Sequence, residues 1–175
     1  ALGMPAFAQN GGKDLVIAYN TGLPSWDPTT GPSAVNPKLQ ALYLSVFDRF
    51  IQQEPDLSFS PGLLTEWGFT DDNKKVRMVV REGVKWHDGS DLTAEDVAWS
   101  LQRAGDPATG NPGQFVWKNL ANFKVDGNVV TADVVQFEPT IFKWMAFLTG
   151  YVLPKAYYEK VGAEGFEKAP IGTGP

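Results

Sequence analysis

Hydrophobic and polar residues alternate most clearly between positions 76 and 81 of the chain. Val76, Met78 and Val80 occupy one face of this segment, while Arg77 and Arg81 lie on the other. Successive side chains of an extended strand point to opposite faces, so a period of two is typical of a strand with one buried face. The pattern predicts a half-buried β-strand.

Turn-forming residues separate this strand from its neighbours. Residues 70–73 are Thr, Asp, Asp and Asn, which readily hydrogen-bond their own backbone. They follow a short apolar stretch at 63–67. Asp-Gly-Asn at 126–128 stands between two β-favouring runs, 123–125 and 129–135. The second arrangement predicts a β-hairpin.

Helix starts are marked by capping residues. Asn36 followed by Pro37 is typical of a helix start, and apolar residues recur at helical spacing up to about residue 52. Thr93 and Asp96 resemble a capping box that opens a second helix, which Gly105 and Pro107 end. Two more helices are expected over residues 140–148 and 154–161.

Segments rich in Gly and Pro interrupt these elements. The apolar run at 15–19 predicts a buried strand, and it opens into a long Gly- and Pro-rich loop at 20–36. A second such loop covers residues 105–114. The first loop is long for a compact domain, and long loops without structure of their own tend to be functional or disordered.

Composition excludes several kinds of site. The 175 residues are 43% hydrophobic and 13% aromatic, which is enough for a core and for one domain or slightly more. The net charge is −5 with scattered Lys and Arg, which argues against a nucleic-acid partner. The absence of Cys excludes disulfides and thiolate ligands, and the single His87 excludes any site that needs two imidazoles. We expect no metal and no cofactor.

The first residues resemble the end of an export signal. Residues 1–8 are apolar and end in Ala-Phe-Ala, a small-x-small pattern typical of signal-peptidase cleavage. The longest apolar stretch elsewhere, 140–154, is interrupted by Lys143 and is too short to span a bilayer. The sequence therefore predicts an exported, soluble, periplasmic protein.

Several motifs occur in an order typical of one family. These are Pro-Gly-Leu-Leu-Thr-Glu-Trp at 61–67, Arg81 after the alternating strand, Val-Lys-Trp-His-Asp-Gly at 84–89, Ala-Glu-Asp-Val at 94–97, and Pro-Ile-Gly-Thr-Gly-Pro at 170–175. Together they resemble the family 5 solute-binding proteins of ABC importers, the peptide and nickel class.

The resemblance implies a fold and a division of the chain. It implies a mixed α/β (α+β) fold like that of the type II periplasmic binding proteins. Residues 9–47 would begin the first lobe, 48–169 would form a small inserted α/β domain, and 170–175 would return to the first lobe. Since family members continue into a second lobe that is absent here, the chain is expected to be a truncated fragment.

The resemblance also implies a function without a chemical step. The protein would bind a di- or oligopeptide, or a similar small solute, in a cleft between two lobes and deliver it to the permease. The missing C-terminal part of the same protein would be a further partner. By position, the expected solute-binding residues are Thr29, Thr30, Gly31, Ser33 and Ala34 in the first loop, and Trp117 after the second. The alternatives are a plain surface loop and a core tryptophan.

Two other functions stay open at this point. A periplasmic hydrolase would use His87 with the acidic residues Asp88, Asp91, Glu95 and Asp96. However, Asp88-Gly89 is typical of a turn and Asp96 of a helix cap, so local structure explains these residues without catalysis. The chain could also be a stand-alone interaction domain.

Overall fold

The computed structural model describes residues 20–147 and 149–175, except for the side chains of Pro32 and Ser33. The strand predicted at 15–19 and the signal tail predicted at 1–8 lie outside the described residues. Within the described part, no helix is long and apolar enough to cross a membrane.

A four-stranded antiparallel sheet is the largest regular unit. Its strands are, in spatial order, β3 (Leu64–Thr70), β4 (Lys75–Val80), β6 (Val129–Val134) and β5 (Leu120–Asp126). Val76 and Met78 of β4 are fully buried, whereas Arg77 between them is exposed. The alternation of this segment is therefore confirmed as a half-buried strand.

Both predicted turns are confirmed. Asp71, Asp72 and Asn73 have positive φ angles of 54°, 51° and 64° and connect β3 to β4. Asp and Asn tolerate this left-handed conformation better than most residues. The β5–β6 hairpin turns at Gly127, whose φ is 57°, between the paired residues Asp126 and Val129.

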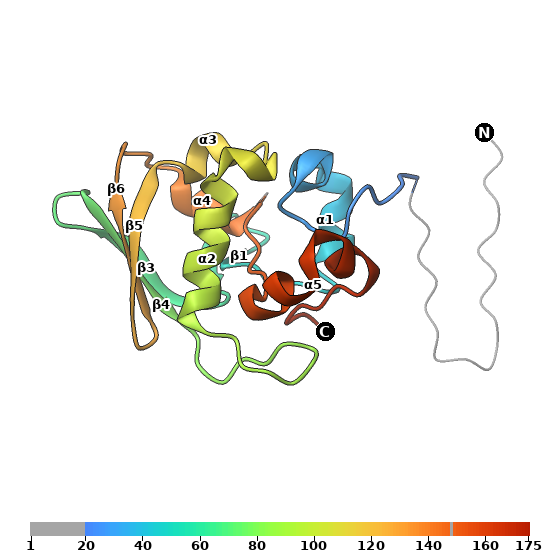
Figure 1. Cartoon of the computed structure of the whole chain (residues 1–175). Coiled ribbons are helices and arrows are strands. Elements are labelled where there is room, and N and C mark those ends of the chain that lie inside the picture. The colour runs from blue at the N-terminus through green and yellow to red at the C-terminus, as the bar shows by residue number, and fades with distance from the viewer. Residues whose placement is uncertain (1–19, 148) are drawn as a thin grey trace.

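Helix α2 (Ala94–Gly105) begins at the predicted capping box. The Asp96 carboxylate accepts the backbone N–H of Thr93 at 2.8 Å. The buried face of α2 packs on the core side of the sheet, and α5 (Lys155–Lys168) lies on the opposite side of α2 (Figure 1). Helix α2 thus stands between the sheet and the rest of the described chain.

The helix predicted to run from Asn36 to about residue 52 is wrong over most of its length. The Asn36 cap is confirmed, since its side chain accepts the N–H of Lys38 at 3.0 Å. The structure then has a 3₁₀ turn, η2 (Pro37–Leu39), a short helix, α1 (Gln40–Tyr43), and a strand, β1 (Ile51–Gln53), which pairs with β2 (Phe59–Pro61). Beyond α1 the backbone leaves the helical path.

Tertiary contacts explain this departure. Phe47 packs with Tyr43 and Tyr151, whereas Phe50 enters the core of the sheet. The backbone N–H of Phe50 donates to the carbonyl of Gly150 at 3.1 Å. A continuous helix would keep both phenylalanines near one face, so long-range contacts override the local helical spacing.

The remaining helices are short or kinked. Helix α4 (Ile141–Ala146) lies within the segment predicted as helical, and α5 is interrupted at Gly162, where φ is 69° and ψ is 178°. The two Gly- and Pro-rich loops contain the turns η1 (Gly31–Val35) and η3 (Pro107–Thr109), and α3 (Gln114–Trp117) follows the second.

The described residues form two apolar clusters. The larger one lies between the sheet, α2, α3 and α4. The smaller one gathers residues of η2, α1 and the following turn with residues just before α5 and one near its end: Leu39, Tyr43, Phe47, Tyr151, Leu153 and Phe166. The first loop and the segment 170–175 lie beside the smaller cluster and provide the contacts described next.

Candidate functional site

Asp27 organises the first loop. Asp27 is only 3% exposed, and its Oδ1 accepts both the backbone N–H of Thr29 at 2.9 Å and the Thr29 hydroxyl at 2.6 Å. Asp side chains commonly accept the N–H two residues ahead in turns. The loop that was predicted to bind solute is therefore folded around a buried carboxylate.

Arg103, in the last turn of α2, neutralises this carboxylate. Its Nη2 lies 2.7 Å from Asp27 Oδ2, and its Nη1 donates to the Thr29 hydroxyl at 2.6 Å. The Arg103 and Asp27 side chains are only 13% and 5% exposed. A charge removed from water in this way requires a partner and further hydrogen bonds, and the geometry supplies both.

Tyr158 of α5 completes the network. Its ring lies 4.6 Å from the Arg103 guanidinium carbon, and its hydroxyl donates to Asp27 Oδ2 at 3.1 Å while accepting from Arg103 Nη2 at 2.8 Å. Burial, and then the neighbouring Asp27 carboxylate, raise the pKa of Tyr158 to about 12. The phenol is thus protonated at neutral pH and available as a donor.

A second carboxylate, that of Glu167 on α5, holds the loop at residues 25–27. It accepts the backbone N–H groups of Trp26 at 2.8 Å and of Asp27 at 3.3 Å, together with the hydroxyl of Ser25. The Tyr43 hydroxyl of α1 donates to the Ser25 carbonyl at 2.7 Å. Side chains from α1, α2 and α5 therefore fix residues 25–29.

The predicted loop residues lie in one turn followed by η1. Thr29 and Ala34 are buried, whereas Thr30 and Gly31 are partly exposed. The Thr30 hydroxyl donates to the Asp27 carbonyl at 3.4 Å, and Gly31 has a φ of 50°, which favours glycine. The side chain of Ser33 lies outside the described residues. Solute contact by these residues stays a prediction.

Trp117 lies apart from this loop, in the core. It is 1% exposed, and its indole N–H donates to the hydroxyl of Thr149 at 2.9 Å. Its ring centroid is 6.5 Å from that of Phe50. Its side chain is thus fully used in packing here, and a role in walling a solute pocket also stays a prediction.

His87 contacts the end of the chain. Its Nδ1 accepts the backbone N–H of Gly172 at 3.3 Å, and its Nε2 lies 2.9 Å from the carbonyl of Gly174. A neutral ring that carries its proton on Nε2 satisfies both contacts. Since both nitrogens face backbone groups, His87 is placed to join two segments.

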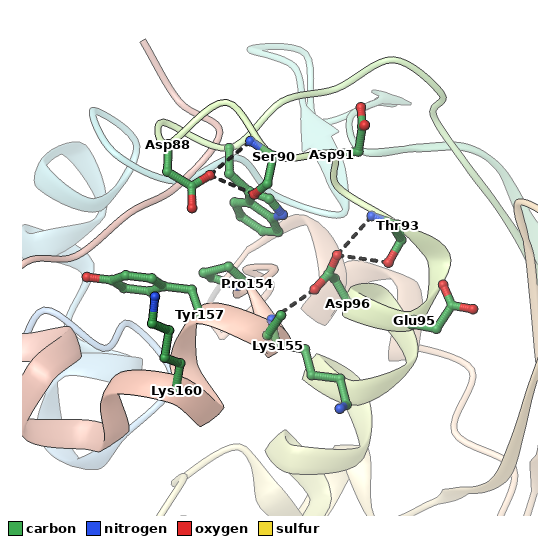
Figure 2. Close-up of a pocket in the computed structure, with 12 residues that line it drawn as sticks. Asp88, Ser90, Asp91, Thr93, Glu95, Asp96, Pro154, Lys155, Tyr157 and Lys160 are labelled. Atoms are coloured by element: carbon green, nitrogen blue, oxygen red, sulfur yellow. Dashed lines mark hydrogen bonds between the residues drawn. The ribbon is translucent and has the colours of Figure 1, made fainter.

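The acidic residues near His87 line a shallow hollow with a volume of about 390 Å³ (Figure 2). Asp96 faces it with both oxygens engaged, because its second oxygen accepts the N–H of Lys155 at 2.8 Å. Hydrogen bonds from the Ser90 hydroxyl and backbone lower the pKa of Asp88. These bonds hold Asp88 in a turn, and a carboxylate that loses its proton readily is a poor general acid.

The residues described in the structure contain no group of three His, Asp or Glu side chains arranged to hold a metal ion. Of the carboxylates that line the hollow, Asp88 is held in a turn, Asp96 in a helix cap, and Asp91 pairs with Lys85 at 2.6 Å. Their arrangement therefore supports local structure at the start of α2.

Sequence reasoning missed Arg103, Tyr158 and Glu167. Each lies on a helix that was predicted or partly predicted, but no local sequence motif indicates that its polar side chain contacts the first loop. Arg103 lies between the buried residues Leu101 and Ala104, and this proximity to an apolar face was the one available signal. Its partners are 74 and 76 positions away in sequence, so only the fold brings them together.

Comparison with known families gives a match over most of the described chain. The sequence profile of the bacterial extracellular solute-binding proteins, family 5 Middle, matches residues 58–175. The glutathione-binding protein GsiB of Shigella dysenteriae is 28% identical over 165 residues, and the alignment covers 93% of this chain and 31% of GsiB.

Solved structures give the same answer for the fold. NikZ from Campylobacter jejuni in complex with Ni(L-His) superposes with a TM-score of 0.76 at 21% identity, over 89% of this chain and 30% of NikZ. The substrate-binding domain of an oligopeptide ABC transporter from Bacillus anthracis superposes with a TM-score of 0.77 at 21% identity, over 91% of this chain and 34% of its own. These superpositions confirm the predicted mixed α/β fold of the type II periplasmic binding proteins. The chain spans about a third of the length of these relatives.

Proposed function

Because this chain belongs to the family 5 bacterial extracellular solute-binding proteins, we propose that it forms part of the solute-binding component of an ABC importer. It holds a di- or oligopeptide, or a similar small solute, in a cleft between two lobes and delivers it to the membrane permease. The family match over residues 58–175 is the observation that carries this proposal. The relatives include a glutathione-binding protein and an oligopeptide transporter domain, which supports the choice of solute class.

The proposed division of the chain follows from the same membership. Residues 9–47 begin the first lobe, 48–169 form the inserted domain, and 170–175 return to the first lobe. The packing of the last segment supports this, since the N–H of Gly174 donates to the carbonyl of Val46 at 2.9 Å. The Thr173 hydroxyl also donates to Asp48 at 2.9 Å. The end of the chain thus lies beside the end of the proposed lobe segment.

Solute contacts are assigned to the loop on the first lobe. Thr30 and Gly31 present a hydroxyl and an accessible backbone at the partly exposed end of the loop. Peptides are commonly held through their backbone, directly or through water, and small residues allow that approach. Thr29 and Ala34 support the loop from its buried side, and Ser33 and Trp117 complete the proposed set.

We further propose that the protein is exported to the periplasm and performs no chemical step. The engagement of both His87 nitrogens with the backbone of residues 172 and 174 favours a joining role for this side chain over a catalytic one. Delivery to a permease then requires only binding, closure and release.

Titration calorimetry with glutathione and with trialanine tests the proposal. We expect saturable binding when the chain is extended to the length of its relatives, and weak or no binding by the 175 residues alone. The change Thr30→Val should weaken binding about fivefold through loss of one hydrogen bond. Thr131→Val on β6, far along the chain from the loop, is the matched control and should leave the affinity unchanged.

The same samples separate binding from hydrolysis. Mass spectrometry of the recovered trialanine should show it intact after prolonged incubation. Cleavage that disappears in a His87→Ala variant would overturn the proposal in favour of the hydrolase. Failure of every peptide to bind the extended chain would reject the assigned solute class.

A further inference from the structure

The first loop is joined to its surroundings in an unusual way. The hydrogen bonds described between residues 25–29 and other elements all have a side chain of α1, α2 or α5 at one end. A strand or helix is held by a repeating backbone ladder, so the loss of one side chain leaves its neighbours in place. This loop has no such ladder, and its position depends on a few individual groups.

Among these groups, Arg103 carries the positive charge that faces the buried Asp27 carboxylate. One guanidinium nitrogen pairs with Asp27, and the other donates to Thr29, so a single planar group joins two residues of the loop. Arginine supplies such a rigid fork, whereas lysine offers only a point charge on a flexible stem. The same guanidinium packs on the ring of Tyr158, which links α5 to the loop.

The burial of this network makes it sensitive. Asp27 has a side chain only 5% exposed, so water cannot replace a lost partner without opening the loop. Asp27 Oδ1 is already saturated by Thr29, and its Oδ2 is shared between Arg103 and Tyr158. Removing Arg103 therefore leaves a buried carboxylate with only neutral donors, and the loop must move to hydrate it.

We propose that Arg103 is a positioning residue for solute binding: without touching the solute, it sets the place and conformation of residues 27–34 from the end of α2. The role in solute binding rests on the proposed function, whereas the control of loop conformation does not. Through Tyr158 and Glu167, the loop is also fixed relative to α5, so three elements determine its position together.

Hydrogen exchange detected by mass spectrometry tests this without any ligand. In Arg103→Met, we expect amides in a peptide covering residues 25–31 to exchange on the order of 10-fold faster or more. Peptides from β4 and β6 should keep their rates. Unchanged exchange in the loop would overturn the proposal. Equal acceleration in loop and sheet would also overturn it, since that outcome indicates general destabilisation.

Two further variants guard against a misfolded Arg103→Met protein. Arg103→Lys keeps the charge and loses the fork, so it should fold and accelerate loop exchange to an intermediate degree. Arg77→Met is the matched control, because Arg77 pairs with Glu66 at 2.9 Å while 45% exposed, and it should change neither region. If Arg103→Lys exchanges like the unaltered protein, the fork is not needed and the proposal fails.

Calorimetry with glutathione and trialanine then links loop position to affinity. Arg103→Lys should weaken whichever probe binds by about 10-fold, in parallel with its loop exchange rate. Equal affinity despite a mobile loop would overturn the role in solute binding. These titrations use the chain extended to the length of its relatives. If neither probe binds that extended chain with Arg103 in place, the proposed solute class fails, while the exchange experiment still decides whether Arg103 positions the loop.

Discussion

The sheet region and the first-loop region of this protein are held together by different means. The sheet of β3 to β6 combines a backbone ladder with an apolar face buried under α2. The loop region has little regular structure and depends on side chains such as Arg103 and Glu167, which lie 76 and 141 positions from their partners. The first region consists of two local hairpins, β3–β4 and β5–β6, joined by the pairing of β4 with β6, whereas the second has no backbone pairing and depends on single side chains distant in sequence.

The contacts of the two regions therefore have different effects: those of the sheet core stabilise the fold, and those of the loop define one conformation. Apolar burial is not directional, so a sheet core tolerates small shifts as long as its volume is filled. A buried carboxylate such as Asp27 accepts donors only in defined geometry, and it therefore specifies one conformation of the loop. The described chain uses both properties, because the sheet region is held by apolar burial while a few polar groups set the conformation of the loop.

Met78→Ala should give the largest loss of stability. Met78 is fully buried at the centre of β4, and truncation of such a residue typically lowers the free energy of unfolding by about 2–5 kcal/mol. Val79→Ala, at the next position on the other face and partly exposed, should cost about 1 kcal/mol or less. Urea unfolding measures both. Equal losses would show that burial on one face of the sheet does not dominate its stability.

The same contrast explains which parts of the fold could be predicted. The β4 strand, the β5–β6 hairpin and the capping box at Thr93 follow from residues within about one turn or one strand of each other. Their free-energy contributions are local, so they leave a pattern in the sequence. The family motifs added the fold class, which the comparisons with solved structures confirm.

Prediction failed where long-range contacts decide the backbone. The segment after Tyr43 has helical spacing, yet Phe47 and Phe50 belong to different clusters and the chain turns between them. The partners of Asp27 could not be predicted for the same reason. Nothing beside Asp27 in the sequence indicates that its carboxylate faces an arginine from α2 and a tyrosine from α5.

Glycine substitutions extend the comparison to segment 170–175, because they should have opposite signs there and in the sheet. A Cβ at Gly172 would lie 1.9 Å from the carbonyl oxygen of Val46, so Gly172→Ala must push two backbone segments apart. We expect a loss of about 1–3 kcal/mol in the free energy of unfolding. Gly68 in β3 has no atom within 4 Å of such a Cβ, and Gly68→Ala should be neutral or stabilise by up to about 1 kcal/mol.

Urea unfolding of the two alanine variants measures these signs directly. Hydrogen exchange at the amide of Gly174, which donates to Val46, should accelerate in Gly172→Ala alone. A stable Gly172→Ala protein would mean that the end of the described chain does not pack closely on the segment after α1.

Alkaline pH should produce the smallest effect, and it should act on the loop region through Tyr158. The pKa of Tyr158 is raised from 10.0 to about 12 in the folded protein, first by burial and then by Asp27. Because the folded pKa exceeds the unfolded one, the stabilising contribution is complete below pH 10 and is lost as the pH rises from 10 through 12. Solvent screens this partly exposed group, so we expect a change of about 1 kcal/mol or less. Tyr158→Phe cannot ionise, and its stability relative to the unaltered protein should therefore improve as the pH rises from 10 to about 12, a range set by the two pKa values. A stability difference between the two proteins that is constant over this range would show that the phenol does not face the Asp27 carboxylate, and the link between α5 and the loop would be lost.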